Sequence, residues 1–87
     1  MGDQKHKVEF FGFTTCSWCK KTKAWLDENG IEVEVVYMNE LEGDERKQAK
    51  ERILEFASRI SFPCVIIDDG AEVVQGYKPD KYEEFLK

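Results

Sequence analysis

The sequence predicts a single α/β domain whose elements follow the order strand, helix, strand, helix, strand, strand, helix. Short runs with strand periodicity alternate with longer segments whose apolar residues recur at helical spacing. The first three elements form a parallel crossover unit, and the dipeptide Asp69-Gly70 predicts a hairpin between the last two strands. The four strands therefore make a mixed sheet, and a chain of 87 residues leaves no room for a second domain.

The first two strands are predicted from alternating side chains. Residues 7–12 place Val8 and Phe10 on one face of a strand and polar or aromatic residues on the other. Residues 32–37 alternate glutamate with valine. Because successive side chains of a strand point to opposite faces, both patterns indicate strands with two different faces.

The first helix is predicted over residues 16–29. Thr14 and Thr15 precede it as candidate cap residues, because a hydroxyl can accept a hydrogen bond from the free N–H groups of the first turn. Gly30 follows the helix and suits the left-handed conformation that ends many helices.

The second helix is predicted to be the longest, from residue 43 to about residue 60. Its apolar residues recur at i, i+4, i+7, i+8 and i+11, which defines one buried face. These residues are Ala49, Ile53, Phe56, Ala57 and Ile60. The opposite face, which we expect to be solvated, carries Glu45, Lys47, Arg52, Glu55 and Arg59.

The last three elements are a hairpin and a helix. Residues 64–68 form a short apolar run that predicts a buried strand, and residues 71–75 predict its partner, joined by a type I′ turn at Asp69-Gly70. Pro79 suits the first turn of a final helix. The residues that this helix is expected to bury are Tyr82, Phe85 and Leu86.

The composition excludes several classes of protein. Lys and Arg number 13 against 18 Asp and Glu, and the net charge of −5 argues against binding to nucleic acid or anionic lipid. No apolar run approaches the roughly 20 residues of a membrane span, and residues 1–7 are too polar to open a signal peptide. Three cysteines do not make a disulfide-stapled secreted scaffold. We therefore expect a soluble, cytoplasmic protein.

Two of the three cysteines, Cys16 and Cys19, are separated by two residues, a spacing that indicates redox chemistry or a metal. At a helix start, the Cys16 sulfur meets free backbone N–H groups and the positive end of the helix dipole. The amines of Lys20, Lys21 and Lys23 add positive potential. Both effects favour the thiolate, which makes Cys16 the expected nucleophile. Cys19 lies one turn further on the same side, from where it can resolve a mixed disulfide at Cys16.

Three segments resemble the glutaredoxin family. The strand at residues 8–11 and the cysteine segment at residues 14–23 closely resemble the active-site segment of glutaredoxins. Residues 61–67, which contain Pro63, are similar to the cis-proline segment that faces the cysteine pair in this family. Residues 76–80 resemble the tail of the glutaredoxin-like redoxins that serve ribonucleotide reductase.

The resemblance implies a thioredoxin-like fold with sheet order 2-1-3-4 and helices on both faces, and a thiol–disulfide oxidoreductase. It implies a cis bond before Pro63, which would expose the backbone of Phe62 beside Cys16 so that an extended disulfide substrate could pair with it. The alternatives are a trans Pro63 that only begins a strand and a Trp18 with no special task. The substrate-binding residues so implied are Thr15, Trp18, Phe62, Pro63 and Tyr77, and the residue implied to favour the thiolate is Lys20.

The chain departs from glutaredoxins that use glutathione. Those proteins usually carry a lysine shortly before the first cysteine and a Gly-Gly step before the last helix, whereas this chain has Phe13-Thr14-Thr15 and a lone Gly76. We therefore expect a monomer that reduces protein disulfides, with ribonucleotide reductase among the candidate substrates, and that requires no cofactor. The reductant stays open among glutathione, a flavin-type thioredoxin reductase and a ferredoxin-linked reductase.

A second function stays open beside disulfide reduction. An iron–sulfur carrier would be a dimer that shares one [2Fe-2S] cluster, with Cys16 from each chain and two glutathione thiols as ligands. A structural zinc site would need the three cysteines and the distant His6, which is a poor arrangement, so we expect no metal site. Cys64 is either a third redox thiol, an added ligand or a small core residue.

Overall fold

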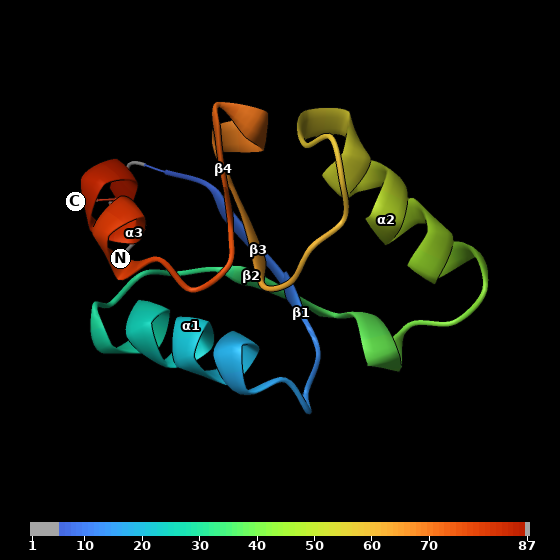
Figure 1. The fold of residues 1–87 in the computed structure, drawn as a ribbon, viewed down its shortest axis with the longest axis horizontal. Coiled ribbons are helices and arrows are strands. Elements are labelled where there is room, and N and C mark those ends of the chain that lie inside the picture. The colour runs from blue at the N-terminus through green and yellow to red at the C-terminus, as the bar shows by residue number, and fades with distance from the viewer. Residues whose placement is uncertain (1–5, 87) are drawn as a thin grey trace.

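The computed structural model describes residues 6–86. Along these residues the elements are β1 (Val8–Gly12), α1 (Ser17–Glu28), β2 (Glu34–Tyr37), α2 (Asp44–Phe56), β3 (Cys64–Ile67), β4 (Glu72–Gln75) and α3 (Pro79–Leu86) (Figure 1). Two short 3₁₀ turns, Met38–Glu40 and Asp68–Gly70, follow β2 and β3. Most of the polar N-terminal segment that argued against a signal peptide lies outside the described residues. No helix within residues 6–86 is long and apolar enough to span a membrane.

The strands form one mixed sheet in the order β2-β1-β3-β4, which confirms the predicted order. β1 runs parallel to β2 and antiparallel to β3, and β3 runs antiparallel to β4. Helices α1 and α3 cover one face of the sheet and α2 covers the other (Figure 1). The chain therefore has the predicted thioredoxin-like architecture, with a separate core on each face of the sheet.

The two cores follow the alternation of the central strands β1 and β3, all of whose residues are buried. Val8 and Phe10 of β1 face α1 and α3, as predicted, together with Leu26 and Tyr82. Phe11 faces the other way and packs with the residues of the α2 side, which include Met38, Ala49, Ile53 and Ile66. A strand buried on both faces needs apolar residues at nearly every position, as β3 has.

The first helix begins differently from the prediction. Thr14 and Thr15 are not its cap residues: Cys16 is the N-cap, and its sulfur accepts the hydrogen bond that a hydroxyl would otherwise accept. The helix ends as predicted, with Gly30 at φ +69°. The N–H groups of Gly30 and Ile31 bond back to the carbonyls of Asp27 and Leu26, the pattern of a Schellman motif.

The second helix is shorter than predicted. It ends at Phe56, and the next residue, Ala57, is extended at φ −133° and ψ 152°. Ala49 and Ile53 are buried as expected, but Ile60 lies beyond the helix and is exposed. The chain has to cross from α2 to the start of β3 here, and the side chain of Gln75 in β4 holds this connection by donating to the Arg59 carbonyl at 2.8 Å. That tertiary requirement outweighs the helical periodicity of residues 57–60.

Arg52 was expected on a solvated face and instead joins three elements. Its guanidinium donates to Glu9 of β1 and to Asp69 of the β3–β4 connection, both at 2.8 Å, and to Glu55 at 3.3 Å. It also lies 4.9 Å from the centre of the Phe56 ring. Helical periodicity predicts on which face a residue lies, but it does not predict that a long side chain such as that of Arg52 reaches back to the sheet.

The hairpin connection is also different from the prediction. The last pair of the β3–β4 ladder is Ile67 with Glu72, so four residues connect the strands instead of a two-residue type I′ turn. Positive φ angles occur at Asp68, Asp69 and Gly70. Asp68 does not continue the β3–β4 ladder. Its N–H donates to the Lys7 carbonyl at 2.7 Å, and its carboxylate accepts the Lys7 N–H at 3.0 Å. The final helix begins at Pro79 and buries Tyr82, as predicted, whereas Phe85 and Leu86 are only half-buried.

Candidate active site

Cys16 stands where the loop after β1 meets α1. Its backbone is extended, at φ −89° and ψ 122°, and its sulfur accepts the N–H of Cys19 at 3.2 Å. Its own N–H donates to the Phe13 carbonyl at 3.2 Å, which closes the loop below the sulfur. The Cys16 side chain is half-buried. The Cys16 sulfur therefore accepts a backbone N–H of the first turn and lies at the positive end of the helix dipole.

Cys19 is in a different environment one turn along the helix. Its side chain is 1% exposed and belongs to the core shared by α1, α3 and the sheet. Burial, followed by its hydrogen bond to Cys16, raises the pKa of the Cys19 thiol to about 11. Cys19 is therefore protonated at neutral pH, and the half-buried Cys16 is the sulfur placed to react first.

Gly12, the last residue of β1, lies directly behind the Cys19 thiol. A Cβ at this position would lie 2.9 Å from the Cys19 sulfur and 2.9 Å from the Phe10 ring. No sequence pattern singled out Gly12 as part of the site. A glycine that ends a strand just before a cysteine pair is the available signal, because glycine in a strand often marks a close approach of another group.

A shallow groove beside α1 brings together four of the five predicted substrate-binding residues. Trp18, Phe62, Pro63 and Tyr77 line it, together with Gly76. The Phe62–Pro63 peptide bond is cis, as the resemblance implied. Trp18 is 56% exposed and stacks on Tyr77, with ring centroids 5.9 Å apart. Thr15, the fifth residue, is exposed in the loop before Cys16 and is not part of this lining.

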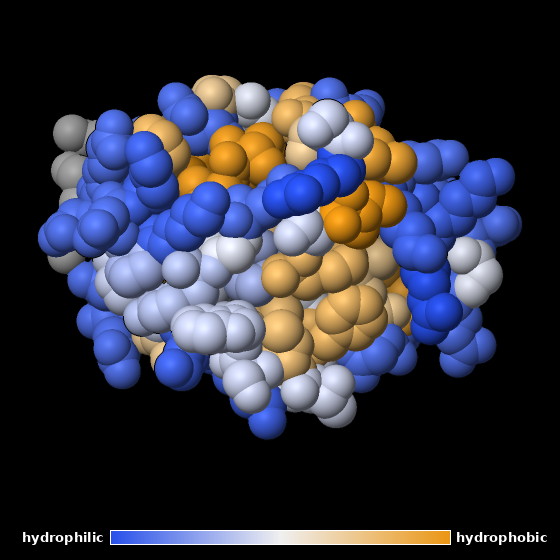
Figure 2. Space-filling model, in the orientation of Figure 1, coloured by the Kyte–Doolittle hydropathy of each residue, from blue (hydrophilic) through white to orange (hydrophobic). Residues whose placement is uncertain are grey.

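Figure 2 shows apolar side chains gathered on this face of the molecule, between α1 and α2, with charged side chains on both flanks. Cys16, Phe62 and Tyr77 all pack against the core that contains Cys19. The groove and the two cysteines are therefore parts of one site. The cysteine pair lies at its helix side and the cis-proline segment lies at its sheet side.

The loop that carries Cys16 is held by contacts with residues distant in the sequence, which local sequence patterns do not predict. The Phe13 ring packs edge-on against the Phe62 ring at 4.8 Å, which joins the cysteine loop to the proline segment. Thr14 and Asn39 exchange two hydrogen bonds, from the Thr14 N–H at 3.0 Å and from the Asn39 amide at 2.8 Å. Thr14, expected as a helix cap, thus ties the loop to the turn after β2.

A buried hydroxyl connects α1, α3 and the groove. Tyr82 donates to the Gly76 carbonyl at 2.6 Å, and its oxygen lies 3.0 Å from the Thr22 hydroxyl, one turn after Cys19. The N–H of Gly76 in turn donates to the Pro63 carbonyl at 2.8 Å. This chain fixes the proline segment relative to the helix of the cysteines. From its sequence pattern Tyr82 is expected only in the core, because its hydrogen-bond partners are distant in the sequence.

The three lysines that follow the cysteines differ in their surroundings. Lys20 is exposed on the first turn of α1, and its effect on Cys16 stays a prediction. Lys21 is exposed as well, and its amine lies 4.7 Å from the centre of the Trp18 ring. Lys23 is partly buried and pairs with Asp27 at 2.8 Å.

Cys64 belongs to the other face of the sheet. Its side chain is fully buried among Phe11, Ile53 and Ile66, on the α2 side, whereas Cys16 and Cys19 lie on the α1 side. Burial raises the pKa of its thiol to about 12. Of the readings that the sequence left open for Cys64, the structure supports a small core residue.

Comparison with known proteins gives a consistent set of relatives. Residues 8–71 match the family described as Glutaredoxin. Among solved structures, the glutaredoxin from Methanosarcina mazei Go1 is 37% identical with a TM-score of 0.85, over 95% of this chain and 86% of that one. Methanoredoxin from Methanosarcina acetivorans is 35% identical with a TM-score of 0.86, over 92% and 83%. The Gene 56 protein of Mycobacterium phage D29 is 31% identical over 71 residues, which are 82% of this chain and 72% of that protein.

Proposed function

Because this chain belongs to the glutaredoxin family, we propose that it is a dithiol oxidoreductase that reduces protein disulfides, with Cys16 as nucleophile and Cys19 as resolving cysteine. The observation that carries the proposal is the contrast between the two sulfurs. Cys16 accepts a backbone N–H at the start of α1, whereas Cys19 lies buried behind it with a raised pKa. Cys16 is therefore placed to attack the substrate first, and Cys19 stays protonated until the second step.

The reaction consists of two exchanges. In the first, the Cys16 thiolate attacks one sulfur of a substrate disulfide, a bond forms between the two sulfurs, and the other substrate sulfur leaves as a thiolate that takes up a proton. In the second, Cys19 loses its proton and attacks the Cys16 sulfur, and the second substrate sulfur leaves and is protonated. The substrate gains two electrons and two protons, and the protein is left with a Cys16–Cys19 disulfide.

The groove supplies the position of the substrate in this scheme. Trp18 and Tyr77 offer an exposed aromatic surface on one side, and Phe62 and Pro63 form the other. An extended chain that carries a disulfide would lie between them and present one sulfur to Cys16. A thiol reductant such as glutathione, or a reductase, returns the Cys16–Cys19 disulfide to the dithiol with two electrons and two protons.

The cell compartment and the protein substrate are further expectations. We expect the activity in the cytoplasm, where thiols are kept reduced. Ribonucleotide reductase is one candidate substrate, because residues 76–80 resemble the redoxins that serve it. That segment lies outside the residues matched by the family, so this candidate stays a prediction.

Three cysteine variants test the proposal. Cys16→Ser should abolish reduction of an insulin-type protein disulfide, and Cys19→Ser should accumulate a mixed disulfide with the substrate, visible by mass spectrometry. Cys64→Ala is the matched control, because it removes a thiol on the other face of the sheet, and it should keep the activity. Undiminished exchange by Cys16→Ser would contradict the proposal.

The reduction potential distinguishes the reductants. Equilibration in dithiol buffers, followed by the fluorescence of Trp18 and Trp25, gives this potential. A value between about −200 and −230 mV would be typical of glutaredoxins and favour glutathione, whereas a value near about −270 mV would favour a dedicated reductase. The iron–sulfur carrier also stays a prediction: visible absorption after anaerobic reconstitution would support it, and a colourless protein would contradict it.

A further inference from the structure

The segments that build the active site are basic, although the chain as a whole is acidic. Residues 13–24, 59–64 and 73–79 contain no aspartate or glutamate, while all 18 carboxylate side chains of the chain lie elsewhere. The same three segments carry five cations. These cations are Lys20, Lys21, Lys23, Arg59 and Lys78.

Four of these cations are exposed to solvent and take part in no ion pair of the described residues. Lys20, Lys21, Arg59 and Lys78 are exposed, and none of them has an ion-pair partner within residues 6–86. The fifth, Lys23, pairs with Asp27. A protein with an excess of carboxylates has left four positive charges unpaired in the segments around one groove, so they are available to a partner.

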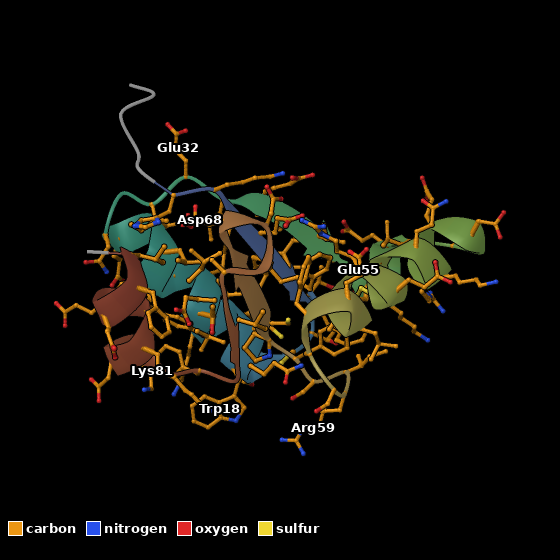
Figure 3. All side chains as sticks on the ribbon, turned by 90° about the horizontal axis from the view of Figure 1, so that it is seen from above. Trp18, Glu32, Glu55, Arg59, Asp68 and Lys81 are labelled. Carbon is orange, nitrogen blue, oxygen red and sulfur yellow. The ribbon has the colours of Figure 1, made fainter. Side chains whose placement is uncertain are left out.

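Contacts place Lys21, Lys78 and Arg59 around the groove, and Lys20 is exposed on the first turn of α1, beside Cys19 in the sequence. The amine of Lys21 lies over the Trp18 ring, and the Cε atom of Lys78 lies 3.7 Å from where a Cβ of Gly76 would stand. The backbone of Arg59 is bonded to the side chain of Gln75, the residue before Gly76. Figure 3 shows Trp18 projecting between Lys81 and Arg59, at the end of the molecule away from Glu32 and Asp68.

The groove is continued by a second hollow along α1. Tyr77 lines the hollow that contains Pro63, and it also lines this second hollow, with Lys21 and Trp25 of α1. The surface therefore continues from the proline segment past the aromatic pair and along α1. The only carboxylate among the residues that line either hollow is Glu28, at the far end of the second one.

We propose that the preferred substrate is a protein disulfide in an extended segment with acidic residues on both sides of the cysteine, recognised by the four unpaired cations Lys20, Lys21, Arg59 and Lys78. This inference rests on the proposed disulfide exchange and names its substrate class. Carboxylates of the partner would meet unpaired cations at the groove and be repelled by the acidic remainder of the surface, so the partner is both attracted and oriented.

Disulfide peptides of equal length test this preference. One carries glutamates around the cysteine, one carries lysines and one carries serines, and kcat/KM is measured for each at about 20 mM and about 300 mM salt. At low salt we expect at least tenfold faster reduction of the acidic peptide than of the basic one, because screening is weak there. At high salt the ratio should fall to about twofold or less. Equal values for the acidic and basic peptides at low salt would overturn the inference.

Two double variants locate the effect. Arg59→Gln with Lys78→Gln removes two charges at the groove, and Lys47→Gln with Lys50→Gln removes two exposed charges on α2. The groove variant should lower kcat/KM for the acidic peptide about fivefold more than for the serine peptide, whereas the α2 variant should change each value less than twofold. Equal losses in both variants would overturn the inference, since the net charge alone would then explain the preference.

The remaining outcomes separate this inference from the function on which it rests. If the unmodified protein reduces none of the three peptides, the proposed oxidoreductase function fails. If it reduces the serine peptide well but shows no charge preference, only the acidic substrate class fails. In a last outcome, the groove variant lowers kcat/KM for oxidised glutathione while the three peptides show equal kcat/KM values. The cations would then bind a small anionic disulfide, and the inference would likewise be wrong.

Discussion

Two cysteines three residues apart differ in almost every property that governs thiol chemistry. Cys16 caps a helix and is partly open to solvent, while Cys19 has 1% of its surface exposed and a pKa of about 11. The cause is geometric: the helix turns the second sulfur inward, under the end of β1 where Gly12 leaves room for it. The order that we propose for the two exchange steps rests on this difference.

Limited alkylation should reveal this order at the scale of the residue. With substoichiometric iodoacetamide at pH 7, we expect Cys16 to be modified first, by at least tenfold over Cys19, because the raised pKa keeps Cys19 protonated. Cys64, which is fully buried with a pKa of about 12, should react only after unfolding in urea. Peptide mapping gives the order, and equal labelling of Cys16 and Cys19 would contradict it.

Gly12 should be required for the resolving step. In Gly12→Ala the new methyl group would lie 2.9 Å from the Cys19 sulfur, so the thiol has to move. We expect a loss of about 1–3 kcal/mol in the free energy of unfolding, which is typical of an overfilled core, and slower closure of the Cys16–Cys19 disulfide. Stopped-flow fluorescence measures the closure, and the alkylation rate of Cys16 is the internal control. An unchanged closure rate would contradict this role of Gly12, since the Cys19 thiol could then move aside without slowing disulfide formation.

At the scale of the element, α3 does more than cover the sheet. Its Tyr82 holds the Gly76 carbonyl and the Thr22 hydroxyl, so one phenol joins the helix of the cysteines to the chain beside Pro63. Burial raises the pKa of this phenol, which keeps its proton available for donation. Three elements that meet only in the folded protein thus share a single buried hydrogen-bond chain.

Tyr82→Phe should therefore lower both the stability of the protein and its activity. It leaves the Gly76 carbonyl and the Thr22 hydroxyl without this partner, which we expect to cost about 1–3 kcal/mol in urea unfolding. It should also lower kcat/KM for a peptide disulfide, because the proline segment is less well positioned. Tyr37→Phe is the matched control, since within residues 6–86 no hydrogen bond of its hydroxyl occurs, and it should stay within about 0.5 kcal/mol. Equal effects of both variants would contradict the role of Tyr82.

For the molecule as a whole, ion pairs hold the β3–β4 connection to its neighbours. Asp69 pairs with Lys7 and Arg52, and Asp68 pairs with His6. Hydrogen bonds from His6 and from Lys7 hold the pKa of Asp68 and of Asp69, respectively, below the usual range. Arg52 also binds Glu9 on β1, so charges join the connection to α2 and to the central strand.

The pH dependence of stability should show a loss at both extremes. The lowered pKa values of Asp68 and Asp69 mean that their contribution is present above about pH 3.8 and is lost as the pH falls through the folded values. The raised pKa of Cys64 acts in the opposite direction: its contribution is present below pH 9.0, and is lost as the pH rises through about 12. Cys19 acts in the same direction up to about pH 11.

Urea unfolding of the reduced protein at several pH values checks this expectation. Between pH 9 and 11, the free energy of unfolding of the unmodified protein should fall relative to that of Cys64→Ala by up to about 1.4 kcal/mol per pH unit, which can make the variant the more stable of the two, since the variant has lost one of the groups that titrate there. At pH 7 the variant should be less stable by about 1 kcal/mol, because it leaves a small cavity. A difference that does not change with pH would contradict the buried, protonated state of Cys64.

The sequence by itself determined the features that depend on near neighbours. Alternation in β1, the cysteine spacing at a helix start, Gly30 and Pro79 are all local signals, and each predicted its element because backbone preference and side-chain periodicity act over a few residues. The sheet order and the cis bond before Pro63 came from the resemblance to a family and not from any pattern in this chain.

Only the tertiary structure decided the features that depend on distant partners. The end of α2 at Phe56 and the four-residue connection after Ile67 arise because the chain has to meet β4 and Lys7, which no local pattern reports. The same holds for Arg52 turned toward Glu9 and for Gly12 set against Cys19. The physical reason is common to these cases: a local preference of a fraction of a kcal/mol per residue is outweighed by a buried contact or an ion pair that exists only after folding.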